Sequence, residues 1–72
     1  MPTSECLMRV EIEREDDGRW IGEVPSLPGV LAYGVTADEA RAKVQALAFR
    51  VIADRLEHGE AVPPEARELF AA

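Results

Sequence analysis

The sequence predicts an α+β domain in which an antiparallel sheet of three or four strands packs on one long helix, in the order ββ-β-α-(β). Three observations predict this class. Apolar and polar residues alternate near the N-terminus, a segment rich in turn residues follows a second extended run, and the middle of the chain has helical periodicity between a capping signal and a glycine. The 72 residues are expected to form a single domain, 1–72, with a small core.

The first two strands are predicted to form a hairpin. In residues 7–14 apolar side chains alternate with charged ones, which is the pattern of a half-buried strand. Residues 19–24 form a second extended run, and residues 15–18 between the two supply acidic turn residues and a glycine that can adopt positive φ. Residues 1–5 are expected to be a loose N-terminus.

A shaped loop is expected after this hairpin. Pro25 and Pro28 exclude both a helix and a central strand from residues 24–29. Leu27 is the apolar residue of this loop, and we expect it to point inward. Residues 30–34 are short and apolar and are predicted to be a third strand.

A long helix is predicted from Ala37 to Glu57. Thr36 and Glu39 have the spacing of a capping box, in which the Thr36 hydroxyl accepts from the Glu39 amide and the Glu39 carboxylate reaches back to the Thr36 amide. Gly59 is suited to the left-handed cap at the other end. The stripe expected to face the core consists of Ala40, Val44, Leu47, Ala48, Val51 and Ile52.

The C-terminal part is expected to contain little regular structure. Ala61 and Val62 are candidates for a brief fourth strand, which the following prolines end. Residues 63–72 are predicted to form a short turn or helix that starts at Pro64.

A second narrow apolar stripe lies nearly opposite the core stripe of the helix. Its members are Ala42, Ala46, Phe49 and Ala53. Two interpretations stay open. The alanines are simply good helix formers beside one exposed aromatic residue, or the stripe is a self-association face anchored by Phe49.

The negative charge is concentrated in the first half of the chain. Residues 1–39 contain nine acidic and three basic residues, whereas residues 40–72 contain five of each, which accounts for the net charge of −6. This distribution argues against direct binding to DNA, because phosphate contacts need Lys and Arg. It favours a basic protein partner.

No catalytic, cofactor-binding or metal-binding set is predicted. The single histidine, His58, stands where a helix ends and is expected to be structural. The single cysteine, Cys6, has no partner for an internal disulfide. No uncharged run is long enough to span a bilayer and no signal peptide is recognisable, so a cytoplasmic protein without membrane contact is expected.

Acidic side chains gather in the first hairpin. Glu11 and Glu13 share one face of the first strand, and Asp16 and Asp17 lie in the adjoining turn. Neighbouring carboxylates can hold a magnesium ion. A run of charge on a strand and a turn is more often a solvated or partner-binding face, which is the interpretation we favour.

Three motifs in this order resemble the HicB-like antitoxin family. The first strand leads to a turn with Asp17-Gly18-Arg19-Trp20, residues 23–29 match a loop of the type E-x-P-x-L-P-G, and residues 34–40 match G-x-T-x-x-E-A. The resemblance covers about residues 7–62. It implies a partial ribonuclease-H-like fold that lacks the carboxylate set of the nucleases.

The resemblance also implies a function. It is that of a non-catalytic antitoxin module, without a cofactor, that binds and occludes a small basic mRNA-cleaving toxin of the HicA type and forms a homodimer or homotetramer. The DNA-binding domain of many family members has no counterpart in this sequence, so no direct DNA binding is expected. The candidate toxin-binding residues are Glu11, Glu13, Asp16, Asp17, Trp20 and Glu23.

Two other functions stay open at this point. One is an orphan oligomeric α+β protein whose partner is unknown. The other is a residual metal-dependent nuclease, suggested by the implied fold, that would use Glu11, Glu13 and Asp17.

Overall fold

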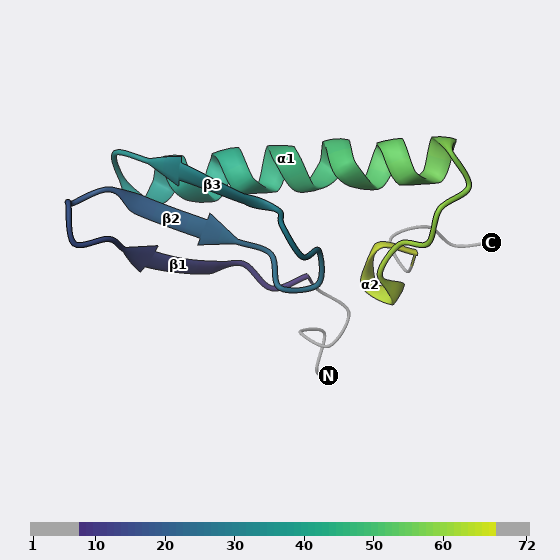
Figure 1. Ribbon diagram of the computed structural model, residues 1–72, viewed down its shortest axis with the longest axis horizontal. Coiled ribbons are helices and arrows are strands. Elements are labelled where there is room, and N and C mark those ends of the chain that lie inside the picture. Colours follow the sequence, from purple (N-terminus) through teal and green to yellow (C-terminus); the bar gives the residue numbers. More distant parts are fainter. Residues whose placement is uncertain (1–7, 68–72) are drawn as a thin grey trace.

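A computed structural model describes residues 8–67 of the chain and confirms the predicted α+β class. A three-stranded antiparallel sheet of order β1-β2-β3 carries the long helix on one face (Figure 1). No helix among the described residues is long and apolar enough to cross a membrane. The elements are β1 (Glu11–Arg14), β2 (Trp20–Glu23), β3 (Leu31–Gly34), α1 (Ala37–Glu57) and α2 (Pro64–Arg67).

The sheet meets α1 through a row of small and apolar residues. Ile12, Gly22 and Ala32 lie side by side in the register of the three strands. A Cβ atom on Gly22 would lie 3.0 Å from Val44 Cγ1 of the helix. The row therefore faces α1, and the absence of a side chain at its centre lets the helix approach the sheet closely.

The first hairpin turn forms as predicted. The Gly18 amide donates to the Glu15 carbonyl at 2.9 Å, and the Glu15 amide donates to the Arg19 carbonyl at 2.7 Å. Gly18 has φ of 92°, a conformation that residues with a side chain rarely adopt. β1 is shorter than the predicted strand, because residues 8–10 are not part of the ladder.

The loop between β2 and β3 consists of two successive turns. The Leu27 amide donates to the Val24 carbonyl, and the Val30 amide donates to the Leu27 carbonyl, both at 2.9 Å. A proline is the second residue of each turn, and Gly29 with φ of 89° is the third residue of the second. The two turns direct Leu27 inward, where its side chain is 0% exposed, which confirms the prediction.

Helix α1 has the predicted bounds, but its N-terminal cap differs in one bond. The Glu39 amide donates to Thr36 Oγ1 at 3.0 Å as expected. The Glu39 carboxylate accepts from the Val35 amide at 2.6 Å and not from the Thr36 amide. The reason is the close approach of Gly34 to Ala40, since it brings the segment before the helix against the first turn.

The C-terminal end of α1 confirms the glycine cap. Gly59 has φ of 70°. Its amide donates to the Leu56 carbonyl at 3.2 Å, and the Glu60 amide donates to the Arg55 carbonyl at 2.8 Å. These two bonds define a Schellman motif, which stops the helix and turns the chain back.

The core lies between the sheet, the proline-containing loop and α1. Its buried members include Leu27, Val44 and Ile52, and Ala66 of α2 is buried among them. Residues 61–62 form no strand, because they lead from the end of α1 to α2, which packs against the loop instead of extending the sheet. Residues 1–5 and 68–72, for which a loose start and the end of a short helix were expected, lie outside the described residues.

Candidate partner-binding face

The face of the sheet turned away from α1 gathers acidic and apolar side chains. Side chains alternate along a strand, and the row that contains Gly22 faces the helix, so the neighbouring residues point to the opposite side. We call this side the outer sheet face. Its members are Glu11, Glu13, Ile21, Glu23, Leu31 and Tyr33.

The side chains of the outer sheet face are accessible. The three glutamates are exposed and Ile21 is half-buried. Leu31 is 38% exposed and Tyr33 39% exposed. The glutamates lie toward β1 and the apolar residues toward β3, so carboxylates border the apolar strip on one side. Apolar residues beside polar ones are the composition of a protein interface.

The charges on this face do not favour the isolated sheet. Glu11 lies directly opposite Glu23 in the β1–β2 register. Like charges in directly opposed positions destabilise a sheet. Arg9 Nη2 lies 2.7 Å from a Glu11 carboxylate oxygen, but both side chains are solvated, so this pair offsets little of the repulsion. The arrangement therefore retains negative charge at the expense of some sheet stability.

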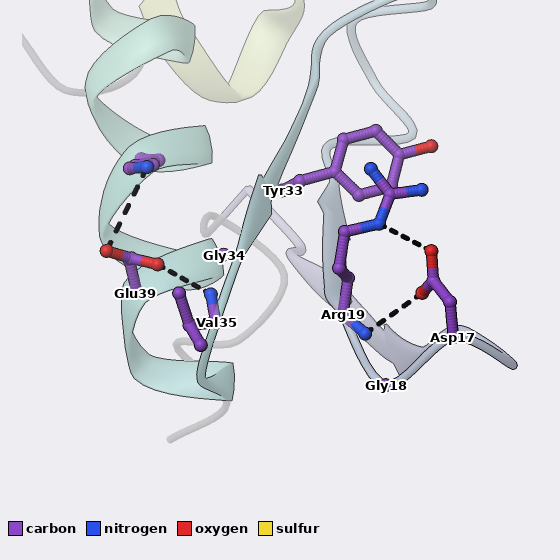
Figure 2. A pocket seen from close by; sticks show the side chains of 8 residues that line it. Asp17, Gly18, Arg19, Tyr33, Gly34, Val35 and Glu39 are labelled. Atoms are coloured by element: carbon purple, nitrogen blue, oxygen red, sulfur yellow. Dashed lines mark hydrogen bonds and ion pairs between the residues drawn. The ribbon is translucent and has the colours of Figure 1, made fainter.

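Arg19 is held in place at the edge of the outer sheet face. Its guanidinium lies over the Tyr33 ring, 4.4 Å from the centroid. Its Nε donates to Asp17 Oδ2 at 2.8 Å, while its backbone amide donates to Asp17 Oδ1 at 3.0 Å (Figure 2). On the other side of the same open pocket, Glu39 lies between Lys43 and the Val35 amide (Figure 2).

The Asp17 carboxyl titrates below the usual range. Its backbone hydrogen bond from Arg19 is the largest cause that lowers its pKa, and the Arg19 guanidinium adds to the effect. The folded chain favours the carboxylate form of Asp17, so the hydrogen bonds from Arg19 stabilise the fold at pH values above the ordinary aspartate pKa. This stabilisation is lost as the pH falls through the lowered pKa of Asp17.

We expect a carbon-detected NMR titration to show a pKa for Asp17 below that of aspartate in an unfolded peptide. Arg19→Ala removes the guanidinium but keeps the backbone amide. The pKa of Asp17 is therefore expected to rise only part of the way to the ordinary value. If the pKa of Asp17 returns completely to the ordinary value in this variant, the guanidinium, and not the amide, stabilises the carboxylate.

The structure brings together only some of the residues predicted to bind a partner. Glu11, Glu13 and Glu23 share the outer sheet face. Asp16 is exposed in the hairpin turn, and Asp17 lies beside it, engaged by Arg19. Trp20 lies on the other side of the sheet, in the row with Gly34, where Arg14 lies 5.9 Å from its ring centroid.

The apolar residues of the outer sheet face were not among the sequence predictions. Ile21, Leu31 and Tyr33 were counted only as parts of short apolar strands. Counting alternate residues across both hairpins would have placed them beside the glutamates, once the register of the second hairpin was known.

The acidic residues in the described part of the chain are not arranged as a metal site. No group of three or more His, Cys, Asp or Glu side chains within residues 8–67 is arranged to hold a metal ion. The set Glu11, Glu13 and Asp17 of the nuclease hypothesis is therefore not assembled. His58 lies at the end of α1 with Nδ1 2.8 Å from the Asp54 carbonyl, as expected of a helix-end residue, and Cys6 lies outside the described residues.

The second stripe of α1 lies outside the core, and two of its members, Ala42 and Ala46, line an open groove together with Ala32 of β3. All four members are exposed, and Phe49 is 65% exposed. The role of this stripe in self-association stays a prediction. The members are Ala42, Ala46, Phe49 and Ala53.

The comparisons with known proteins give one match. The model of the UPF0150-like family matches residues 4–63. This segment contains all three strands, the proline-containing loop and α1, and thus the whole outer sheet face. No curated protein and no solved structure matches the sequence.

Proposed function

This chain belongs to the UPF0150-like family, and we propose that it acts as a non-catalytic antitoxin module that binds and occludes a small basic mRNA-cleaving toxin. The observation that carries the proposal is the outer sheet face, on which Glu11, Glu13 and Glu23 lie beside an exposed apolar strip. The motif order that resembles the HicB-like family supports the same function.

The mechanism is occlusion by competition for the same cationic groups. A ribonuclease holds RNA phosphates with Lys and Arg. The carboxylates of the outer sheet face bind those groups in place of the phosphates. Ile21, Leu31 and Tyr33 provide the apolar centre that holds the partners together after encounter.

Electrostatics sets the rate of this encounter. The opposite charges of the two surfaces steer the partners together, and added salt screens that attraction. The like-charge pair Glu11 and Glu23 is then explained, because a cationic partner relieves the repulsion that the free chain tolerates.

The test measures RNA cleavage by a purified HicA-type toxin while the chain is titrated into the reaction. Glu13→Gln/Glu23→Gln removes two charges from the outer sheet face and is expected to weaken inhibition about tenfold, mainly through slower association. The control Glu57→Gln/Glu60→Gln removes the same charge from exposed positions at the end of α1. It is expected to inhibit like the parent chain.

Urea denaturation separates this effect from a loss of folding. Removing Glu23 relieves its repulsion with Glu11, so the midpoint of the first variant is expected to stay level or rise. The proposal fails if both variants inhibit equally well, or if the association rate is the same at low and high salt.

A further inference from the structure

β3 is an edge strand without the usual protection. Within residues 8–67 it pairs only with β2. The run Val30–Val35 around it contains neither a charged residue nor a proline. Natural edge strands commonly carry charges or prolines that prevent pairing with other chains, as β1 does with Glu11, Glu13 and Arg14.

The free edge of β3 presents backbone hydrogen-bonding groups. The Val24 amide donates to the Val30 carbonyl at 3.2 Å, so Ala32, two residues further on, also turns its backbone toward β2. Leu31 and Tyr33 consequently turn their N–H and C=O groups away from the sheet. The next outward amide, that of Val35, is occupied by the Glu39 carboxylate, which ends the open stretch.

A groove runs beside this edge. Its volume is about 480 Å³, and it lies between β3 and α1, which follows the same border of the sheet (Figure 1). Apolar side chains form most of its lining, and two cations complete it. The lining residues are Ala32, Ala42, Lys43, Ala46, Leu47 and Arg50.

The two cations are available to a ligand. Lys43 Nζ lies 3.9 Å from a Glu39 carboxylate oxygen, a loose and solvated pair. Arg50 has no ion-pair partner in the part of the chain that the structure describes. The groove therefore carries positive charge, whereas the outer sheet face carries negative charge. The basic surface of the proposed toxin does not suit the groove.

We propose that β3 binds an extended acidic peptide segment of a partner protein as a fourth strand. The backbone of that segment bonds to the open groups of Leu31 and Tyr33. Its alternate side chains enter the groove, where an apolar residue packs on the alanines and a carboxylate lies near Lys43 and Arg50. This site shares Leu31 and Tyr33 with the outer sheet face, but it uses their backbone groups and not their side chains. It does not depend on the proposed inhibition of a toxin.

Charge favours a peptide over a second copy of the chain as the occupant. Pairing of β3 with its own copy would bring two α1 helices against each other. Each helix carries Lys43 and Arg50 on this side, so cations would face cations. An acidic strand that has no helix of its own beside it avoids both conflicts.

The probe is a blocked, fluorescein-labelled octapeptide of sequence TVTETVTE, in which valine and glutamate take turns on one face of the strand and threonine occupies the other. We expect saturable binding in fluorescence anisotropy, and protection of the Leu31 and Tyr33 amides from hydrogen exchange. The same peptide with N-methyl groups on alternate residues cannot donate along one edge and is expected to bind about tenfold more weakly. Equal binding of both peptides, or no binding of either, overturns the proposal.

Variants of the groove test the role of the cations. Lys43→Glu/Arg50→Glu is expected to lower the affinity for the peptide at least about tenfold. Arg41→Glu/Arg67→Glu changes the net charge equally at exposed positions outside the groove and is expected to bind nearly as the parent does. An equal loss of affinity in both variants would show that the net charge of the chain, and not the two cations of the groove, determines peptide binding. Protection of Leu31 and Tyr33 in a dimer without peptide would identify a second copy as the occupant, against the proposal.

Discussion

Replacing Gly34 by alanine is expected to be among the most destabilising single changes in this chain. A Cβ atom at this position would lie 2.5 Å from the Ala40 backbone nitrogen and 3.0 Å from its Cα. Both are main-chain atoms of the first turn of α1, so no side chain can rotate away. We expect a loss of about 3 kcal/mol in the free energy of unfolding and a fall of about 15 °C in Tm.

Gly29→Ala is the matched control for this change. Gly29 has φ of 89° but no atom within 4 Å of the position of an added Cβ. It should therefore lose only the strain of a left-handed residue, about 1 kcal/mol. Thermal unfolding followed by circular dichroism compares the two. If Gly34→Ala melts no lower than Gly29→Ala, the contact between β3 and α1 is looser than the structure shows.

Gly34 also determines where both proposed surfaces lie. It ends β3 and places α1 directly behind it, so that Glu39 reaches the Val35 amide. The same contact fixes the distance between β3 and the side of α1 that carries Lys43. A partly folded Gly34→Ala variant should therefore lose peptide binding in the groove before it loses the hairpin of the outer sheet face.

The local features of the fold were predictable because their signals are local. The bounds of α1 follow from Thr36, Glu39 and Gly59, whose roles depend on residues only a few positions away. The inward position of Leu27 follows from two prolines that leave few conformations to the loop. Only one bond of the N-terminal cap differs from the prediction, the one that the Glu39 carboxylate accepts. It depends on how closely Gly34 approaches the helix.

The candidate site was predictable only in part, because it depends on contacts between distant residues. The glutamates were recognised from their spacing along each strand. Trp20 was predicted to bind the partner together with them, although alternation places it on the helix side of the sheet. The groove was not predicted, because it requires the position of α1 along the edge of β3, which the packing at Gly22 and Gly34 determines.

Leu27→Ala is the second change with a large expected effect. It also separates the structural role of the proline-containing loop from partner binding. Leu27 is one of the two largest fully buried side chains in the described part of the chain, although it lies in a loop. Its truncation leaves a cavity between the loop and the core. We expect the free energy of unfolding to fall by about 3 kcal/mol and Tm to fall by about 15 °C.

Leu31→Ala is the same substitution at a site on the outer sheet face. Its side chain is already 38% exposed, so the loss of stability should be below about 1 kcal/mol. If the outer sheet face binds the toxin, Leu31→Ala weakens inhibition while the chain stays folded. Leu27→Ala should inhibit normally at low temperature, where enough of it is folded, and fail on warming. If Leu31→Ala inhibits normally and folded Leu27→Ala does not inhibit, the loop, and not the outer sheet face, contacts the partner.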